Sequence, residues 1–557
     1  MSYVQFHESG PCAVVGPAYE LLTLRALKTI DDSVALCFGG EIMAAQTDVL
    51  IVGAGPTGLA LALWLTRQGV AVRIVDKSPG PGEASRAMAV QARTLELYRQ
   101  LGLAEAVIDA GYKTPAMNMW ARGSHRARIP LKDAGAEISP YPFVLIYPQD
   151  RHERLLVQQL HSLGVDVEWQ TELLSFEEGE NHVTALLKQA DGREGALTAA
   201  YLAGCDGARS LVRHQIGSGF EGGTYKHLFY VADVRVTGIE PAGEAHIAFD
   251  KSDFVLLLCY GEKDQYRLIG TVRDERAEHP EHLTFADVAH DAINGLNLKI
   301  TEVNWFSTYR VHHRVTDHFR RGRAFLLGDA AHVHSPAGGQ GMNTGILDAN
   351  NLAWKLAAVV KGKAPDTLLD SYQIERQAFA RKLVETTDKL FTFVTAQGGF
   401  ADFVRTRIAP IFASVAYKSG GVREFLFRVV SQTSLDYRDS PLSQGRAGEV
   451  QGGDRLPWLS RAIADNYDSL TAIQWQVQVY GEAKADLAQW CTKHGIALHV
   501  FAWEHAYEKA GIARNATYLL RPDTYVALAD PEGEASTLNR YFEERGVMLP
   551  VGSRHNQ

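Results

Sequence analysis

The chain has 557 residues, of which 46% are hydrophobic and 22% charged, and its formal net charge is −9 at pH 7. This length suggests several domains and the composition is typical of a globular protein, while the acidic balance argues against nucleic acid as the main partner. The five cysteines are far apart and include no CxxC pair, which argues against a disulfide framework or a zinc site and favours a reducing, cytoplasmic location.

Residues 1–42 show no clear hydrophobic period, and the first clear strand begins only after Met43. We expect this segment to be an N-terminal extension outside the fold, or the product of a mis-assigned upstream start with Met43 as the true start. A helical appendage through Leu21–Ile30 is the alternative. Glu8 and Glu20 interrupt the region where a secretory signal would be basic and then apolar, so no signal peptide is predicted.

A strand–turn–helix–strand unit spans Val49–Asp76. An apolar run leads into Gly53-x-Gly55-x-x-Gly58, and a helical pattern then continues as far as Gly69. In such a unit the first glycine permits a tight turn, the second lets the backbone approach a pyrophosphate, and the third lets helix and strand pack closely. The free N–H groups at the helix start attract the phosphates. The unit therefore predicts a dinucleotide site, with a purely structural turn as the alternative.

Asp76 ends the second strand of this unit. From that position its carboxylate can accept hydrogen bonds from both hydroxyls of an adenosine ribose. The charge-free stretch Val49–Thr66 is long enough to suggest a membrane span, but the glycines and Pro56 near its start favour a buried strand and helix. We therefore expect no membrane span.

Two strings after Asp76 point to a family. Ser85-Arg86-Ala87 and Arg93-Thr94-Leu95-Glu96, taken with Gly-Ala-Gly-Pro-Thr-Gly at 53–58, resemble the FAD-dependent aromatic hydroxylases, the group A flavoprotein monooxygenases. The resemblance implies that FAD is the dinucleotide and that Arg86 lies against its phosphates and ribityl chain. It also implies that Gln149 hydrogen-bonds the ribityl chain, although a helix-start glutamine facing water is the alternative. The other cofactor contacts expected here are Pro56, Thr57, Lys77 and the backbone of Leu173, which meets the adenine.

A second glycine–acid string, Cys205-Asp206-Gly207-Ala208-Arg209-Ser210, is followed by Val212-Arg213. An Asp-Gly pair at a strand end is commonly no more than a turn. The longer string resembles the second fingerprint of the same family, which serves both FAD and the pyrophosphate of NAD(P)H. We expect Asp206 to order the turn and either Arg209 or Arg213 to contact phosphates.

The pattern changes to alternating apolar residues between Tyr225 and Trp305, with turn signals separating the runs. This alternation predicts an antiparallel sheet that has one face covered. In the family such a sheet covers the flavin ring and supplies the substrate pocket. Sequence alone does not say which side chains face the flavin, and ordinary sheet packing is the alternative for each candidate. The candidate wall residues are Tyr230, His246, Phe254, Leu256, Leu258, Tyr260 and Arg267.

A third string begins as a strand ending in Gly328-Asp329 and continues through a loop into a long helix. Apolar residues at spacings of three and four, from Ile346 to Val360, predict that this helix is amphipathic. The string resembles the Gly-Asp motif of the family, which implies that Asp329 binds the ribityl chain. The positive end of the helix would stabilise negative charge on the reduced ring. Residues expected around the ring are Gly341, Met342 and Asn343 at the pyrimidine edge, and Pro336, Ala337 and Gly338 at the open face, where they also border the substrate; Gly339 is a further expected cofactor contact.

His332 and His334 form an HxH pair just after this motif. Two histidines at that spacing can share a metal ion, but no carboxylate or cysteine stands at a suitable spacing to complete the site. We therefore expect no metal.

The C-terminal third begins with a helical stretch from Tyr372 to about Val430, followed by a polar, glycine-rich segment, Asp439–Gly453, which we interpret as a linker. The order of strands and helices beyond it resembles a thioredoxin-like fold. Two strings, at 452–457 and 520–527, resemble the C-terminal domain of the phenol- and polyketide-hydroxylase branch of the family. Cys491 is the only cysteine there, which excludes an internal dithiol–disulfide couple. We expect a structural or oligomeric role for this domain, in a monomer or homodimer.

The sequence therefore predicts an α/β fold with a Rossmann-like FAD-binding domain, an inserted antiparallel substrate sheet and a C-terminal thioredoxin-like domain. The expected boundaries are 43–222 and 311–400 for the two parts of the FAD-binding domain, 223–310 for the sheet, 401–447 for a helical connection and linker, and 448–557 for the last domain.

The resemblance implies an FAD-dependent monooxygenase. NAD(P)H would reduce FAD by binding transiently against the same domain, O₂ would add to the flavin as a C4a-hydroperoxide, and one oxygen would pass to a small phenolic or polyketide-like aromatic substrate. Alternatives on the same fold are an epoxidase, a Baeyer–Villiger-type enzyme, a reductase or a halogenase, although the halogenase string Trp-x-Trp-x-Ile-Pro is absent. A non-catalytic flavin-binding protein is the alternative outside the enzymes.

Overall fold

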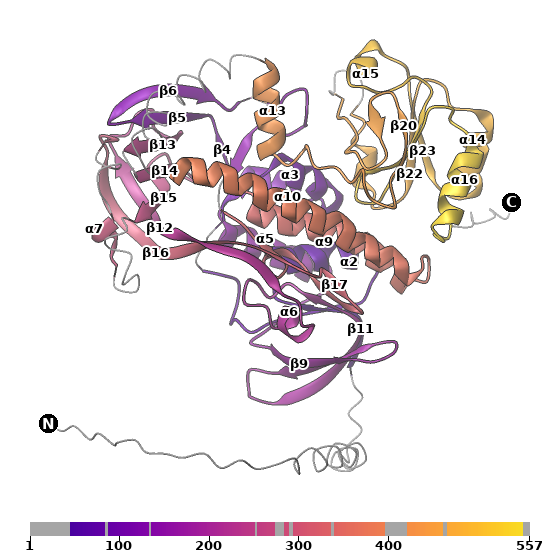
Figure 1. Ribbon diagram of the computed structural model, residues 1–557, viewed down its shortest axis with the longest axis horizontal. Coiled ribbons are helices and arrows are strands. Elements are labelled where there is room, and N and C mark those ends of the chain that lie inside the picture. Colours follow the sequence, from indigo (N-terminus) through magenta and orange to yellow (C-terminus); the bar gives the residue numbers. More distant parts are fainter. Residues whose placement is uncertain are drawn as a thin grey trace, which may run out of the picture. The chain divides into compact units, whose positions relative to one another are not determined.

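The computed structural model describes residues 45–83, 87–132, 135–250, 253–272, 283–288, 293, 295–335, 339–395, 420–459 and 465–549 (Figure 1). The segment expected to be an extension, residues 1–42, lies outside the described residues, as do Arg86 and Pro336, Ala337 and Gly338. None of the described helices has the length and apolar content that crossing a bilayer requires.

One sheet carries the strands that precede all three glycine–acid turns. It has eight strands, and its central path is β17-β18-β11-β1-β2-β8. Parallel pairs join β1 to β2 and β11 to β18, so that the turns after β1, β11 and β18 gather at one edge of the sheet. The strands are β1 (Ala45–Val52), β2 (Val72–Asp76), β8 (Val167–Trp169), β9 (Glu172–Glu178), β10 (Val183–Lys188), β11 (Glu194–Gly204), β17 (Arg320–Arg321) and β18 (Ala324–Leu326).

Helix α2 (Pro56–Arg67) follows β1 and packs against the long helix α9 (Gly341–Val360). The apolar stripe expected on α9 is buried, and the polar residues on its other side are buried as well, since residues 343–357 are all buried. Ile346 and Leu352 lie in the core shared with α2, while Trp354 packs among residues of the C-terminal part. Its buried charges are paired inside the protein, Lys355 with Glu375 and Asp348 with Arg376.

Figure 1 labels most of the other helices, with α7 beside β12 and β15 and α14, α15 and α16 beside the C-terminal strands. Within the described residues they are α3 (Ala92–Tyr98), α4 (Ala104–Ala110), α5 (Gln149–Ser162), α6 (Leu211–Gln215), α7 (Phe285–Val288), α10 (Asp370–Thr395), α13 (Gly420–Val430), α14 (Ala485–Lys493), α15 (His505–Lys509) and α16 (Ala535–Glu544). Short 3₁₀ turns stand at Arg99–Leu101, Gly328–Ala330, Asp366–Leu369 and Ser469–Thr471.

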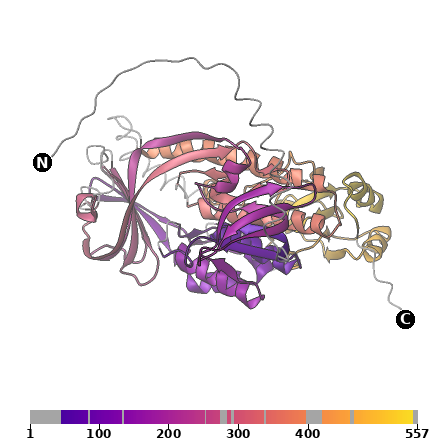
Figure 2. The same ribbon diagram turned by 90° about the horizontal axis from the view of Figure 1, so that it is seen from below.

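A second sheet of eight strands has the order β19-β16-β12-β15-β14-β13-β5-β6. Its longest pair, β12 and β16, can be followed in Figure 2. Pairing from β16 through β12, β15 and β14 to β13 is antiparallel, in agreement with the alternation. β5 and β6 come from earlier in the chain than the sequence suggested and join β13 through a parallel contact. The strands are β5 (Ala116–Ala121), β6 (Ser124–Pro130), β12 (Phe220–Thr237), β13 (Ala245–Asp250), β14 (Asp253–Cys259), β15 (Gln265–Val272), β16 (Lys299–Thr316) and β19 (His332–Val333).

The two faces of this second sheet differ in burial. Successive residues of a strand point to opposite faces, and directly paired residues share a face. On β14 the odd-numbered residues Val255 and Leu257 are buried, and they pack against Val288 and Leu296. We call this the covered face. The even-numbered residues of β14 are only partly buried, and we call their side the half-buried face.

A third sheet, in the C-terminal part, has the order β21-β20-β25-β24-β22-β23. Residues 439–453 are not a linker, since β20 (Gln444–Ala447) pairs with β25 and β21 (Val450–Gln451) pairs with β20. Close strand packing, and not a flexible linker, explains glycine here. Gly445 has φ +75°, and a β-carbon there would overlap the carbonyl oxygen of Ala529. The other strands are β22 (Gln476–Tyr480), β23 (Ala497–Phe501), β24 (Thr517–Leu520) and β25 (Val526–Asp530); a small sheet elsewhere joins β3 (Ala89–Val90), β7 (Val144–Ile146) and β4 (Tyr112–Thr114).

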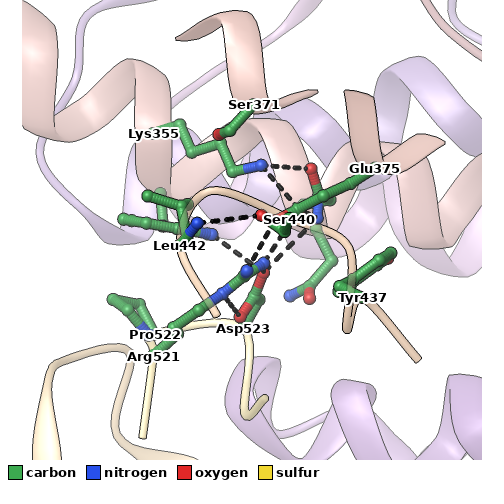
Figure 3. Close-up of polar contacts among 12 residues, drawn as sticks. Lys355, Ser371, Glu375, Tyr437, Ser440, Leu442, Arg521, Pro522 and Asp523 are labelled. Carbon is green, nitrogen blue, oxygen red and sulfur yellow. Dashed lines mark hydrogen bonds and ion pairs between the residues drawn. The ribbon is translucent and has the colours of Figure 1, made fainter. Parts of the chain in front are cut away.

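A fully buried group of charges, here called the Glu375 network, joins α9 and α10 to the C-terminal sheet (Figure 3). The Glu375 carboxylate accepts from Arg521 Nη1 and Ser440 Oγ at 2.6 Å each and from Lys355 Nζ at 2.7 Å. Arg521 also pairs with Asp523, which accepts a hydrogen bond from a tryptophan of α9. Burial would raise the pKa of Glu375, but Arg521 and Lys355 together hold it well below its ordinary value.

Candidate functional site

The first glycine turn is shaped by close backbone contacts. Gly53 has φ +104°, and a β-carbon there would overlap the carbonyl oxygen of Cys205, while one at Gly58 would overlap the carbonyl oxygen of Gly53. A β-carbon at Gly55, in contrast, would meet no atom within 4 Å. Two glycines of the motif are thus required by the fold itself. The third, Gly55, borders open space at the start of α2, as expected where a ligand approaches the backbone.

The start of α2 has the properties of an anion site. Gly55 is the N-cap and provides no side-chain hydrogen bond, Pro56 follows, and the first turn has no acidic residue. The free N–H groups and the positive dipole end therefore have no partner from a capping side chain. Asp76 lies beside this turn, where its Oδ2 accepts from Ala54 N at 2.7 Å and its Oδ1 from Ser78 N at 2.8 Å. Each carboxylate oxygen keeps a lone pair for a further donor such as a hydroxyl.

Backbone hydrogen bonds bring the second and third turns against the first. Cys205 N donates to Val52 O at 2.7 Å, and Leu327 N donates to Gly204 O at 3.0 Å. A β-carbon at Gly328, which has φ +58°, would lie 2.7 Å from Thr57 Oγ1. The third turn therefore lies directly on the first turn of α2. Three turns that are far apart in the sequence meet at one place.

The second turn is ordered by its own residues. Asp206 Oδ2 accepts from Leu211 N at 2.7 Å and from Val212 N at 3.2 Å, so it caps α6, which agrees with the expectation that Asp206 orders the turn. Arg213 donates to Ala330 O at 2.8 Å and packs over an aromatic ring. Its guanidinium holds the second turn to the third, whereas Arg209 is exposed.

At the third turn, Gly328 and Ala330 are buried but Asp329 between them is exposed. The helix that follows, α9, starts without a capping side chain and without an acidic residue in its first turn. Its residue Met342 is half-buried, and the Asn343 side chain is used within the protein, accepting from Gln91 N at 2.9 Å and donating to Ala89 O at 2.8 Å. Only backbone N–H groups of this first turn are left to a ligand.

The loop after β2 is held by a residue that the sequence analysis missed. Glu153, on α5, accepts from Gly82 N at 2.8 Å and from Gln149 Nε2 at 2.7 Å. Gln149 Oε1 in turn accepts from Ala87 N at 3.2 Å, directly after Arg86. The spacing of four between Gln149 and Glu153 on one helix was a usable signal. Lys77 is exposed, and Leu173 is buried in a strand that starts beside Asp76, whose carbonyl accepts from Thr171 N at 2.9 Å.

Five of the seven candidate wall residues share the half-buried face of the second sheet. Phe254, Leu256 and Leu258 alternate along β14, and Arg267 is paired directly with Leu258. Arg267 binds Asp233, which the sequence analysis missed, through two hydrogen bonds of 2.7 Å. Its guanidinium carbon lies 5.9 Å from the ring of Tyr260. The face is apolar and aromatic, with one charged pair.

Tyr230 and His246, the other two candidate wall residues, lie on the covered face instead. Tyr230 packs among the buried residues of the covered face, and His246 is paired with Leu257. His246 is fully buried, and its Nε2 lies 3.0 Å from Pro241 O, to which only an N–H can donate. Its Nδ1 accepts from Trp120 Nε1 at 3.2 Å. Alternation alone cannot assign a face when both faces are apolar.

Acid should destabilise the protein through two buried histidines, His246 of the second sheet and His152 of α5. Burial lowers the pKa of His246 and of His152 to about 4, below the ordinary value of 6.5. The unfolded chain therefore binds more protons, and stability falls as pH decreases from about 6.5 to about 4, by about 3 kcal/mol for each histidine. Thermal unfolding between pH 7 and 4.5 measures the slope. His246→Gln should make the slope shallower, whereas His161→Gln, at an exposed histidine, should not change it.

Among the described residues, no three histidine, cysteine or acidic side chains are grouped so that they could hold a metal ion. His332 and His334 point to different partners: His332 Nε2 lies 2.7 Å from a carboxylate of α9, and His334 Nδ1 lies 2.9 Å from Ser335 O.

Comparison with known proteins gives matches to an FAD-binding family and to monooxygenases. A family model described as an FAD binding domain matches residues 46–387. The 6-methylpretetramide 4-monooxygenase of Streptomyces rimosus is 33% identical over 516 residues, which cover 88% of this chain and 92% of that protein. The pentachlorophenol 4-monooxygenase of Sphingobium chlorophenolicum is 33% identical over 430 residues, which cover 74% of this chain and 76% of that protein.

Solved structures extend this likeness beyond residues 46–387. A ternary complex of aklavinone-11 hydroxylase with FAD and aklavinone has a TM-score of 0.73 at 28% identity and covers 90% of this chain and 99% of that chain. An anhydrotetracycline hydroxylase from Streptomyces rimosus has a TM-score of 0.71 at 26% identity and covers 91% of this chain and 100% of that chain.

Proposed function

We propose that this chain, which belongs to the FAD-dependent aromatic hydroxylases, uses two of its sheets for its monooxygenase function, one for the cofactor and one for the substrate. The turns of the first sheet hold FAD, and the half-buried face of the second sheet holds the aromatic substrate. The observation that carries this proposal is the meeting of the three glycine–acid turns around the start of α2. Their residues fit FAD. The open space beside Gly55 can hold a phosphate, and the exposed Asp329 carboxylate can accept hydrogen bonds from a polyol.

Each turn has a separate part in this proposal. The N–H groups at the start of α2 bind the pyrophosphate, and the Asp76 carboxylate accepts from the ribose hydroxyls. Asp329 accepts from the ribityl hydroxyls, and Gln149 binds the backbone of Ala87, the residue after Arg86. The first turn of α9 offers N–H groups and a positive dipole end to the negative edge of the reduced ring.

Bound FAD would supply the redox chemistry, in which NAD(P)H provides two electrons, one oxygen atom of O₂ passes to the aromatic ring and the other leaves as water. The protein orients that ring and excludes water. Burial and then the Asp233 carboxylate raise the pKa of Tyr260 to about 12, so its hydroxyl keeps its proton at neutral pH and is a donor rather than a phenolate. We propose that Tyr260 and the Asp233–Arg267 pair orient the polar edge of a phenolic or polyketide-like substrate, while Phe254 and Leu256 contact its rings.

A turnover assay tests the hydroxylase assignment. The purified holoenzyme is mixed with NADH or NADPH and a panel of phenols and polycyclic polyketides, while nicotinamide oxidation, O₂ uptake and product mass are followed. We expect substrate-stimulated O₂ uptake and a product that gains one oxygen atom. Reduction of the flavin without any oxygenated product across the panel would contradict the proposal.

Two adjacent leucines of β14 test the substrate face. Leu256→Ala should raise the KM or Kd of an aromatic substrate about tenfold with little change in stability, because Leu256 is half-buried and points away from the core. Leu257→Ala should lower the free energy of unfolding by about 2–5 kcal/mol with little change in KM, because Leu257 is fully buried on the covered face. Thermal unfolding and substrate titrations compare the two; equal effects on KM would refute the assignment of faces.

We propose the following arrangement of domains for the chain. The second sheet is an insertion in the FAD-binding domain, and the C-terminal sheet with α14 and α16 is a thioredoxin-like domain with a structural role, because Cys491 is buried and has no cysteine partner among the described residues. We further propose the domain boundaries given above, except that β20 moves the start of the last domain to Gln444 or earlier, together with a cytoplasmic location and a monomer or homodimer.

A further inference from the structure

A carboxylate buried beneath the third turn has no part in the proposal above. Asp348, on α9, is fully buried. Its Oδ2 accepts from Gly328 N at 3.0 Å and lies 2.7 Å from His332 Nε2. Its Oδ1 accepts from Arg376 Nε at 2.6 Å. One side chain thus binds the backbone just before Asp329, one histidine of the HxH pair and an arginine of α10.

This carboxylate is ionised and fixed in position. Burial would raise the pKa of Asp348, but Arg376 and then His332 lower it below its ordinary value. Arg376 is itself fixed, since it donates to Tyr437 Oη at 2.9 Å and to Thr344 O at 3.2 Å. A hydrogen bond from a backbone N–H to such a carboxylate is stronger than one between neutral groups.

We propose that Asp348 is a positioning residue for the flavin half of FAD, acting through the Gly328 N–H to set the place of the Asp329 carboxylate. Gly328 is buried and Asp329 is exposed, so the fixed N–H lies directly before the residue whose side chain would reach the ligand. His332 binds the same carboxylate, which gives this histidine of the HxH pair a role other than metal binding. The inference rests on the proposed contact between Asp329 and the ribityl chain.

Binding of FAD and ADP to the full-length chain freed of flavin tests the inference. ADP contains only the half that the first turn binds, whereas FAD also needs the third turn. In Asp348→Asn an amide nitrogen replaces one accepting oxygen, so that its N–H groups face the N–H donors of Gly328, His332 or Arg376. We therefore expect FAD affinity to fall about tenfold to a hundredfold while ADP affinity stays within about twofold. Arg376→Lys, which keeps the positive charge but loses the fixed geometry, should weaken FAD about threefold to tenfold with the same selectivity.

Lys355→Met is the matched control, because it also removes a buried ion pair between α9 and α10, Lys355 with Glu375, but one that does not contact Gly328. It should lower the unfolding temperature as the Asp348 variant does, yet leave the ratio of FAD to ADP affinity unchanged. The inference is overturned if Asp348→Asn and Arg376→Lys both keep this ratio, or if Lys355→Met changes it equally. Unchanged FAD affinity in Asp329→Ala would instead contradict the proposed function.

Discussion

Glu375→Gln should lower the free energy of unfolding by about 3–5 kcal/mol, because it leaves buried positive charge without its partner. Arg521 and Lys355 both bind this carboxylate, and none of the three side chains is exposed. Arg521 keeps the Asp523 carboxylate as a partner, but a neutral amide cannot replace the ion pair that Lys355 makes with Glu375. Urea unfolding followed by tryptophan fluorescence and flavin release measures the loss.

The acid dependence gives a second signature of the same variant. Because the folded-state pKa of Glu375 is lowered from 4.5, its contribution to stability is present above that pH and is lost as pH falls below it. Glu375→Gln should lack this part of the acid dependence. Arg154→Ala, at the half-exposed pair with Asp150, should change stability by less than about 1 kcal/mol. Equal losses in the two variants would show that the Glu375 network does not hold the C-terminal part in place.

Local motifs explain what could be predicted from the sequence. Each glycine–acid turn is determined by residues close together in the sequence. The conformation of Gly53 and the position of the Asp76 carboxylate depend on a strand, a turn and a helix that follow one another. The resemblance to a family then supplied the convergence of the turns. Nothing within one turn indicates that Cys205 will bind Val52.

Pairings between distant residues explain what could not be predicted. Arg521 and Glu375 are 146 residues apart, and each alone has the appearance of a solvated surface charge. The two apolar faces of the second sheet give the same alternation, so Leu256 and Leu257 are indistinguishable before the covering residues are known. The enclosure of α9 likewise depends on C-terminal residues that pack around Trp354. Tertiary contacts decided each of these cases.

Gly55→Val should leave the fold intact but lower FAD affinity by about a hundredfold, which corresponds to about 2.7 kcal/mol. The φ of Gly55 is −73°, which any residue adopts, and its β-carbon would meet no protein atom within 4 Å. The new side chain would therefore occupy only the space that we assign to the pyrophosphate. Flavin content after purification and titration with FAD measure the effect, and the unfolding temperature of the flavin-free chain should match that of wild type.

Gly58→Ala is the contrasting variant within the same motif. Its β-carbon would overlap the carbonyl oxygen of Gly53, so α2 would have to move away from β1 and the flavin-free chain itself should be destabilised. One glycine of the motif would thus serve the cofactor and the other the fold. If Gly55→Val retained wild-type flavin, the pyrophosphate would not lie at this turn, and if both variants lost stability equally, Gly55 would be a structural glycine as well.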